Sequence, residues 1–216
     1  KDWERLSYNR VVASELDLSR ADALVEREAK AADVAVIVIG RSSTEEADRR
    51  LKNDFDLSDI EKDMLVRVAR HFHQAGKKVV VVLNACGALE IASWRQYPDA
   101  ILMAWLPGQE CGNAVADVLC GKAYPSGKLP MTLSMNYEDI PSSRNYPQLG
   151  LDHSGRNWDY TNYEEGIWVG YRYFDTKGAE VAYPFGFGLS YTRFAYSNPS
   201  VKRTSTGWQA TVQVKN

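Results

Sequence analysis

The chain has 216 residues, 44% of them apolar, which is enough for one large domain with a hydrophobic core and the beginning of another. Its 26 basic residues are balanced by 28 acidic ones and form no basic block, so neither nucleic acid nor a membrane is expected as a partner. The longest apolar stretch, residues 34–39, is far too short to cross a bilayer, and the first residues do not form a signal peptide.

The first predicted unit is a helix followed by a buried strand. Apolar residues recur at helical spacing over residues 21–32, which predicts an amphipathic helix. Residues 34–39 are then apolar without alternation. Because apolar residues occupy inward and outward positions alike, we expect both faces of this strand to be covered, as in a parallel sheet between layers of helices.

The second unit repeats this order. Ser58 and Glu61 have the spacing of a capping box, so a helix is predicted to begin after Ser58. Gly76 is expected to end it, because glycine readily takes the left-handed conformation that follows many helices. The apolar run of residues 79–83, four valines and a leucine, predicts the second buried strand.

The third unit is expected to contain a short helix through Leu89, Ile91 and Trp94. A strand over residues 100–105 and a helix over residues 109–120 complete it. Three alternations of strand and helix predict an α/β fold, with a mostly parallel sheet sandwiched by helices.

The carboxyl ends of the strands are the places to search for chemistry. In parallel α/β sheets, ligands bind just beyond these ends. The segments that follow the predicted strands are residues 40–55, 84–88 and 106–112.

The composition changes after Gly121, where proline, glycine, serine, asparagine and tyrosine dominate. This composition predicts a segment that wraps over a surface without building layers. From Phe194 the residues alternate around a turn near residues 204–207, which predicts an antiparallel hairpin. We therefore expect three parts: an α/β-sandwich domain over 1–125 that lacks its first strand and helix, a wrapping interdomain segment over 126–192, and the first strands of a truncated antiparallel β-sandwich over 193–216.

The cysteines do not follow the paired spacing that a zinc site requires. Cys86, Cys111 and Cys120 lie in apolar or helical stretches. We expect them to be thiols of the core, with no metal role.

Several motifs occur in a definite order along the chain. Residues 38–49, Val-Ile-Gly-Arg-Ser-Ser-Thr-Glu-Glu-Ala-Asp-Arg, lead from the first strand into a loop with adjacent carboxylates. The others are Lys-Lys-Val-Val-Val-Val-Leu-Asn at 77–84, Pro-Gly-Gln-Glu at 107–110, Pro-Ser-Gly-Lys-Leu-Pro-Met-Thr at 125–132, Glu-Gly-Ile-Trp-Val-Gly-Tyr-Arg-Tyr-Phe-Asp at 165–175, and Tyr-Pro-Phe-Gly-Phe-Gly-Leu-Ser-Tyr-Thr at 183–192. In this order they resemble glycoside hydrolase family 3, the β-glucosidase and β-xylosidase family.

The resemblance implies a retaining, exo-acting β-glucosidase that removes terminal β-linked glucose from oligosaccharides or glycosides. Enzymes of this family have a barrel domain with an aspartate nucleophile, an α/β sandwich that contributes an acid/base glutamate, and often a fibronectin-III-like domain. The chain would then be the second domain and the start of the third, and the barrel would be its partner. The resemblance implies no cofactor and no metal, and it favours a periplasmic or secreted location.

The same resemblance assigns the acid/base role to Glu45, by its place in the matched loop. Retaining hydrolysis needs one carboxylate to attack the sugar and a second carboxyl group to protonate the leaving oxygen. The family loop commonly has glycine on each side of its glutamate, whereas this chain has Thr44 and Glu46. Glu46 therefore stays open as the alternative acid/base residue.

Three neighbours of Glu45 are candidates for substrate binding. Arg41, Asp48 and Arg49 could position Glu45 or contact sugar hydroxyls. The alternative is a local cluster of salt bridges that holds the loop.

The sequence allows two other classes of function to be compared with a glycoside hydrolase. A nucleotide- or phosphate-binding module needs a glycine-rich turn or a Walker lysine, and residues 40–44 provide neither. A non-catalytic sugar-binding or scaffold relative stays open, as does a β-xylosidase of the same family.

Overall fold

The structure, a computed structural model, describes residues 18–41, 49–144 and 163–216. Its main sheet has three parallel strands in the order β1-β2-β3. These strands are β1 Val34–Gly40, β2 Lys78–Asn84 and β3 Ala100–Met103. The parallel sheet predicted from alternating helices and strands is therefore confirmed.

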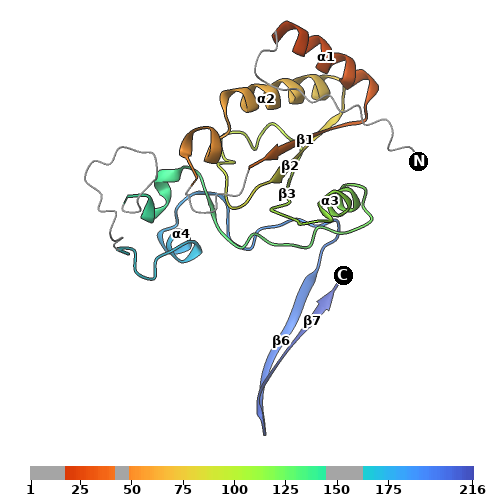
Figure 1. Cartoon of the computed structure of the whole chain (residues 1–216). Helices are drawn as coiled ribbons and strands as arrows, with labels where there is room; N and C mark the ends of the chain where they lie inside the picture. Colours follow the sequence, from red (N-terminus) through yellow and green to blue (C-terminus); the bar gives the residue numbers. More distant parts are fainter. Residues whose placement is uncertain (1–17, 42–48, 145–162) are drawn as a thin grey trace.

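Helices lie on both sides of this sheet. Figure 1 shows α1 (Leu18–Ala31) and α2 (Asp59–Gln74) on one side and α3 (Cys111–Leu119) on the other. The capping box of α2 is present as predicted, since Ser58 Oγ accepts from the Glu61 amide at 3.2 Å and Glu61 accepts from the Ser58 amide at 2.8 Å. The buried face of α2 carries residues at helical spacing, which are Leu65, Ala69 and Phe72.

The strand β1 is buried on one face only within the described part of the chain. Ala35, Ile37 and Ile39 are buried, whereas Val34, Val36 and Val38 are 43, 46 and 63% exposed. Successive side chains of a strand point to opposite faces, so the alternation means that nothing described here covers the outward face. The expectation that both faces of β1 are covered is therefore wrong for the described residues.

The segment between β2 and β3 is a series of turns, and the short helix predicted through Leu89, Ile91 and Trp94 is absent from it. The carboxylate of Glu90 accepts from both the amide and the hydroxyl of Ser93 at 2.6 Å. The indole Nε1 of Trp94 donates to the Glu90 carbonyl at 2.6 Å. Only a single helical turn forms here, in which the Arg95 amide donates to the Ile91 carbonyl at 2.9 Å, and Trp94 is left almost fully buried in the core.

The region after α3 adds short elements that pack against the main sheet. Two short strands pair in antiparallel fashion, and Leu133 and Ala182 from them join the main hydrophobic core. The elements of this region are β4 Leu133–Ser134, η3 Tyr137–Asp139, η4 Pro141–Arg144, α4 Tyr171–Lys177 and β5 Val181–Tyr183.

The predicted hairpin at the end of the chain is confirmed. The strands β6 (Ala195–Thr204) and β7 (Gly207–Lys215) pair in antiparallel fashion, and every residue in them is exposed. Figure 1 shows the hairpin extending away from the α/β part. Large apolar side chains such as Trp208, which is 73% exposed, therefore have no cover from the described residues.

The three cysteines do not lie in the core. Cys86 and Cys120 are exposed and Cys111 is partly exposed, so the prediction of core thiols is wrong. In the described ranges, no helix is long and apolar enough to cross a membrane.

Candidate functional site

The carboxyl ends of the parallel strands meet at one edge of the sheet. Gly40 at the end of β1 lies beside Asn84 at the end of β2, and the Arg41 amide donates to the Asn84 carbonyl at 3.0 Å. At the next strand, the Ala104 amide donates to the Leu83 carbonyl at 2.9 Å. This is the edge at which ligands bind in parallel α/β sheets.

Segment 42–48 follows β1 in the sequence and contains Glu45, Glu46 and Asp48. These residues lie outside the described part of the chain. Arg41 and Arg49, which flank the segment, are both described.

Arg41 is held by two acidic residues. Its Nη1 and Nη2 donate to the two carboxylate oxygens of Glu61 at 2.7 and 2.9 Å. Its Nε donates to the Asp54 carbonyl at 2.8 Å, and the side chain is only 9% exposed. Burial works to raise the pKa of Glu61, but hydrogen bonds from Arg41 and Ser58 outweigh it, so the pKa of Glu61 lies below its ordinary value.

Arg49 is held at the other end of the segment. Its Nη1 donates to Oδ1 of Asp54 at 2.7 Å, and its Nη2 donates to the Cys86 carbonyl just after β2. The side chain is 12% exposed. Arg41 and Arg49 are therefore joined through Asp54, one at its carbonyl and the other at its carboxylate.

Asp54 lies in an unusual turn, η2 (Leu51–Phe55). The turn is closed by a hydrogen bond from the Asp56 amide to the Leu51 carbonyl at 2.8 Å, and Asn53 takes a left-handed conformation with φ of 65°. The Arg50 amide donates to Oδ2 of Asp54 at 3.2 Å. Both oxygens of the Asp54 carboxylate are thus occupied.

These contacts give Arg41 and Arg49 partners within the protein, as in the salt-bridge alternative of the sequence analysis. Their role in substrate binding stays a prediction. The sequence did not indicate these partners, because Glu61 is distant from Arg41 in the chain and Cys86, whose carbonyl accepts from Arg49, is distant from Arg49.

Asp56, which follows η2, was not singled out from the sequence. Burial raises its pKa, the negative charges of Glu90 and Glu138 raise it further, and Lys62 acts in the opposite direction. Asp56 therefore keeps its proton to higher pH than an exposed aspartate does.

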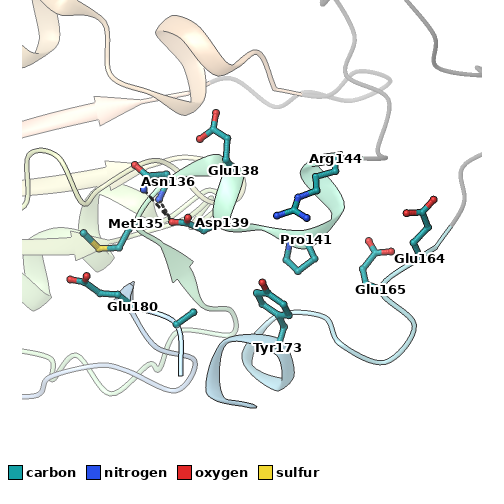
Figure 2. A pocket seen from close by; sticks show the side chains of 11 residues that line it. Met135, Asn136, Glu138, Asp139, Pro141, Arg144, Glu164, Glu165, Tyr173 and Glu180 are labelled. Carbon is teal, nitrogen blue, oxygen red and sulfur yellow. Dashed lines mark hydrogen bonds between the residues drawn. The ribbon is translucent and has the colours of Figure 1, made fainter. Parts of the chain in front are cut away.

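A cavity of about 530 Å³ lies near this turn (Figure 2). The ring of Phe55 in η2 meets the ring of Tyr137 edge-on at 5.9 Å, and Tyr137 is followed directly by cavity residues. Most charged side chains of the cavity wall are carboxylates. The charged residues of the wall are Glu138, Asp139, Arg144, Glu164, Glu165 and Glu180. The sequence analysis missed this cavity, because its residues come from separate short elements and follow no spacing.

Two carboxylates of the wall differ in their partners. Figure 2 shows Asp139 turned toward Asn136, whose backbone amide donates to Oδ2 of Asp139 at 2.8 Å. Oε2 of Glu165 is buried and has no hydrogen-bond partner among the described residues. No group of three or more His, Cys, Asp or Glu side chains in the described ranges is arranged to hold a metal ion.

The comparison with known families is decisive. A sequence model of the glycosyl hydrolase family 3 C-terminal domain matches residues 10–191. The chain belongs to glycosyl hydrolase family 3. Among curated relatives, a β-glucosidase of Ruminococcus albus is 38% identical over 198 residues, which are 90% of this chain and 19% of that protein.

Other family 3 relatives broaden this picture. An exo-α-(1→6)-L-arabinopyranosidase of Bifidobacterium longum is 37% identical over 88% of this chain and 24% of its own length. The structure of β-glucosidase 3B from Thermotoga neapolitana in complex with glucose matches with a TM-score of 0.81 and 46% identity, over 90% of this chain and 27% of that one. This family 3 chain therefore spans about a fifth to a quarter of the relatives that it matches.

Proposed function

We propose that this chain is part of a retaining, exo-acting β-glucosidase and supplies Glu45 as its acid/base residue. The aspartate nucleophile lies on a barrel domain outside this sequence, and the barrel is the partner against which the edge of the sheet is placed. The substrate is a terminal β-linked glucose of an oligosaccharide or glycoside. In this proposal, residues 193–216 begin a fibronectin-III-like domain and residues 126–192 connect it to the α/β sandwich.

The observation that supports the proposal most is the place where segment 42–48 begins. The bond from the Arg41 amide to Asn84 extends the pairing of β1 and β2 to the residue before the segment. In the sequence, Glu45 therefore follows a strand that ends at the edge where ligands bind in parallel α/β sheets, in a chain that belongs to a family of glycosyl hydrolases.

The chemistry divides between two carboxyl groups. In the first step Glu45 donates its proton to the leaving oxygen while the aspartate attacks the sugar and forms a covalent intermediate. In the second step the ionised Glu45 takes a proton from the water that releases the sugar. Arg41, Asp48 and Arg49 belong to the surroundings of Glu45, either as ligands of sugar hydroxyls or as supports of the loop.

The sugar itself has a second candidate. One of the relatives is named as an arabinopyranosidase and is as similar as the β-glucosidases, with 37% identity against 38%. A terminal pentose is therefore the alternative substrate, and a β-xylosidase falls in this class. Rates on matched nitrophenyl glucoside, xyloside and arabinoside distinguish these candidates.

The test of the assignment is a pair of substitutions in a full-length enzyme that contains the barrel. Glu45→Ala should slow hydrolysis of a glycoside with a poor leaving group by about 10²- to 10⁴-fold and affect an activated aryl glycoside less, because the activated leaving group needs no proton. Glu46→Ala is the matched control and should stay close to wild type. If Glu46→Ala instead slows the poor leaving group more than the activated one, Glu46 is the acid/base residue. If neither variant shows this difference, the proposal fails.

The 216-residue chain alone provides an independent test. Because the nucleophile lies outside it, the purified chain should hydrolyse no glycoside. Detectable hydrolysis that is lost on Glu45→Ala would contradict a site divided between two domains.

A further inference from the structure

We infer that the cavity of about 530 Å³ beside η3 and η4 is a binding site for a polyhydroxylated ligand such as a disaccharide. Its volume lies within the range of roughly 300 to 1,000 Å³ that is usual for ligand pockets. The inference goes beyond the proposed function, because it concerns described residues only and requires neither Glu45 nor a barrel domain.

The part of the wall that η3 provides is fixed by its own hydrogen bonds. The backbone amide and Nδ2 of Asn136 donate to Oδ2 of Asp139 at 2.8 and 3.3 Å. The Ile140 amide donates to the Tyr137 carbonyl at 3.1 Å. Asn136 and Asp139 therefore keep their places in the wall without a ligand.

The part of the wall that α4 provides is anchored in the same way. Phe174 is 4% exposed, and its ring meets the ring of Tyr173 edge-on at 5.4 Å. The Ala179 amide donates to the Phe174 carbonyl at 3.0 Å, just after the helix. Met135 and Glu180 adjoin the paired strands β4 and β5. The cavity is thus largely formed in advance, which lowers the cost of ordering it around a ligand.

Two charged groups of the wall are not used by the described part of the protein. The guanidinium of Arg144 has no partner among the described residues. Oε2 of Glu165 is buried and likewise lacks a donor there, which costs free energy until a donor reaches the carboxylate. Figure 2 shows that Arg144 and Glu165 come from different elements of the wall.

The mixture of these groups indicates the class of ligand. Arg144 can only donate hydrogen bonds and an ionised Glu165 can only accept them, whereas a hydroxyl group does both. An amine would leave Arg144 unused, and an anion would be repelled by the carboxylates of the wall. A metal ion does not fit either, since no three His, Cys, Asp or Glu side chains in the described ranges are arranged to hold one.

The apolar part of the wall suits the carbon skeleton of a sugar. Pro141 and the partly buried ring of Tyr173 line the cavity together with the polar groups. Ligand pockets combine such apolar surface with a few polar groups that fix the orientation of the ligand. A neutral sugar matches both kinds of surface, because its hydroxyl groups and its C–H faces point in different directions.

The experiment is an NMR titration of the 216-residue chain with cellobiose. We expect saturable shifts of backbone amides in the cavity wall, among them those of Glu165, Tyr173 and Ala179, and none in β6 and β7. Because cellobiose carries no charge, its dissociation constant should stay the same at low and high salt.

Two substitutions and two matched controls locate the binding. Arg144→Ala and Tyr173→Ala should each raise the dissociation constant about ten-fold, through loss of a charged donor or of an aromatic face. Arg172→Ala and Tyr171→Ala remove the same side chains at positions of α4 outside the cavity wall and should leave the constant unchanged.

Several results would overturn the inference. These are an absence of saturable shifts, shifts confined to other elements, or equal weakening by the control substitutions. Spermidine is titrated alongside: if it shifts the cavity amides and cellobiose does not, the site takes cations and the inference also fails.

The outcome does not depend on one variant or on catalysis. Arg144 is exposed and has no partner among the described residues, so Arg144→Ala decides by itself if Tyr173→Ala does not fold. The titration involves no bond cleavage. Failure of cellobiose to bind therefore leaves the role of Glu45 standing, and a failure of the Glu45→Ala test leaves the sugar-binding cavity standing.

Discussion

The guanidinium of Arg41 and the carboxylate of Glu61 form an ion pair with two hydrogen bonds, of 2.7 and 2.9 Å. Glu61 also completes the capping box of α2 through Ser58. One side chain therefore connects the start of a helix with the residue that precedes segment 42–48. The start of α2 and the position of the Arg41 side chain therefore depend on the same contact.

Replacement of Glu61 by glutamine should lower the free energy of unfolding by about 1 to 3 kcal/mol, because it removes the partner of a nearly buried arginine while Glu61 itself is partly exposed. The chain offers a matched control in Glu26→Gln, whose partner Lys30 lies on the exposed surface of α1. Denaturant unfolding of both variants checks this. Equal effects of the two substitutions would contradict a special role of the Arg41 pair.

The fold should lose stability in acid partly through Asp22. The hydrogen bond with His71, followed by that with Arg67, lowers the pKa of Asp22 to about 2, from 3.8. Because the folded-state pKa lies below the unfolded value, the charged Asp22 stabilises the fold above about pH 4, and this contribution is lost as the pH falls from about 4 to about 2.

Asp22→Asn tests this pH dependence. The thermal midpoint of the variant should lie below that of wild type near pH 5, and the difference should shrink as the pH falls toward about 2. A difference that stays constant over this range would show that the charge of Asp22 does not contribute.

Trp94 is the side chain on which the turn between β2 and β3 depends. It is 1% exposed, and its indole donates to the Glu90 carbonyl at 2.6 Å. Trp94→Ala should lower the free energy of unfolding of the chain by about 3 to 5 kcal/mol. Trp208→Ala removes the same side chain from an exposed hairpin and should have little effect; a larger loss at Trp208 would contradict the burial pattern.

Local patterns predicted the regular elements well. The spacing of Ser58 and Glu61 predicted both bonds of the capping box, because the two residues form it without help from distant parts of the chain. The β-branched runs predicted β1 and β2 for a similar reason. The helix expected through Trp94 is wrong, since only one helical turn forms there, with the Arg95 amide donating to the Ile91 carbonyl, and the spacing of apolar residues does not indicate how many turns follow.

What the sequence could not predict depends on tertiary contacts. The apolar run of β1 predicted that both of its faces are buried, but Val34, Val36 and Val38 are exposed among the described residues. Such a run does not indicate which residues would cover the second face. The loop sequence suggested salt bridges for Arg41 and Arg49, but Asp54 became their common partner only through the conformation of η2. The cavity beside η3 and η4 is formed from segments that are distant in sequence, so no single motif predicted it.

The most direct measurement of the role of Glu45 is rescue by azide in a full-length enzyme. When an acid/base carboxylate is removed from a retaining glycosidase, a small anion can attack the covalent intermediate without needing a general base. We expect azide to accelerate Glu45→Ala on an activated β-glucoside and to yield β-glucosyl azide, with no such product from Glu46→Ala. No acceleration of Glu45→Ala by azide, or an α-configured product, would contradict Glu45 as the acid/base residue of a retaining enzyme.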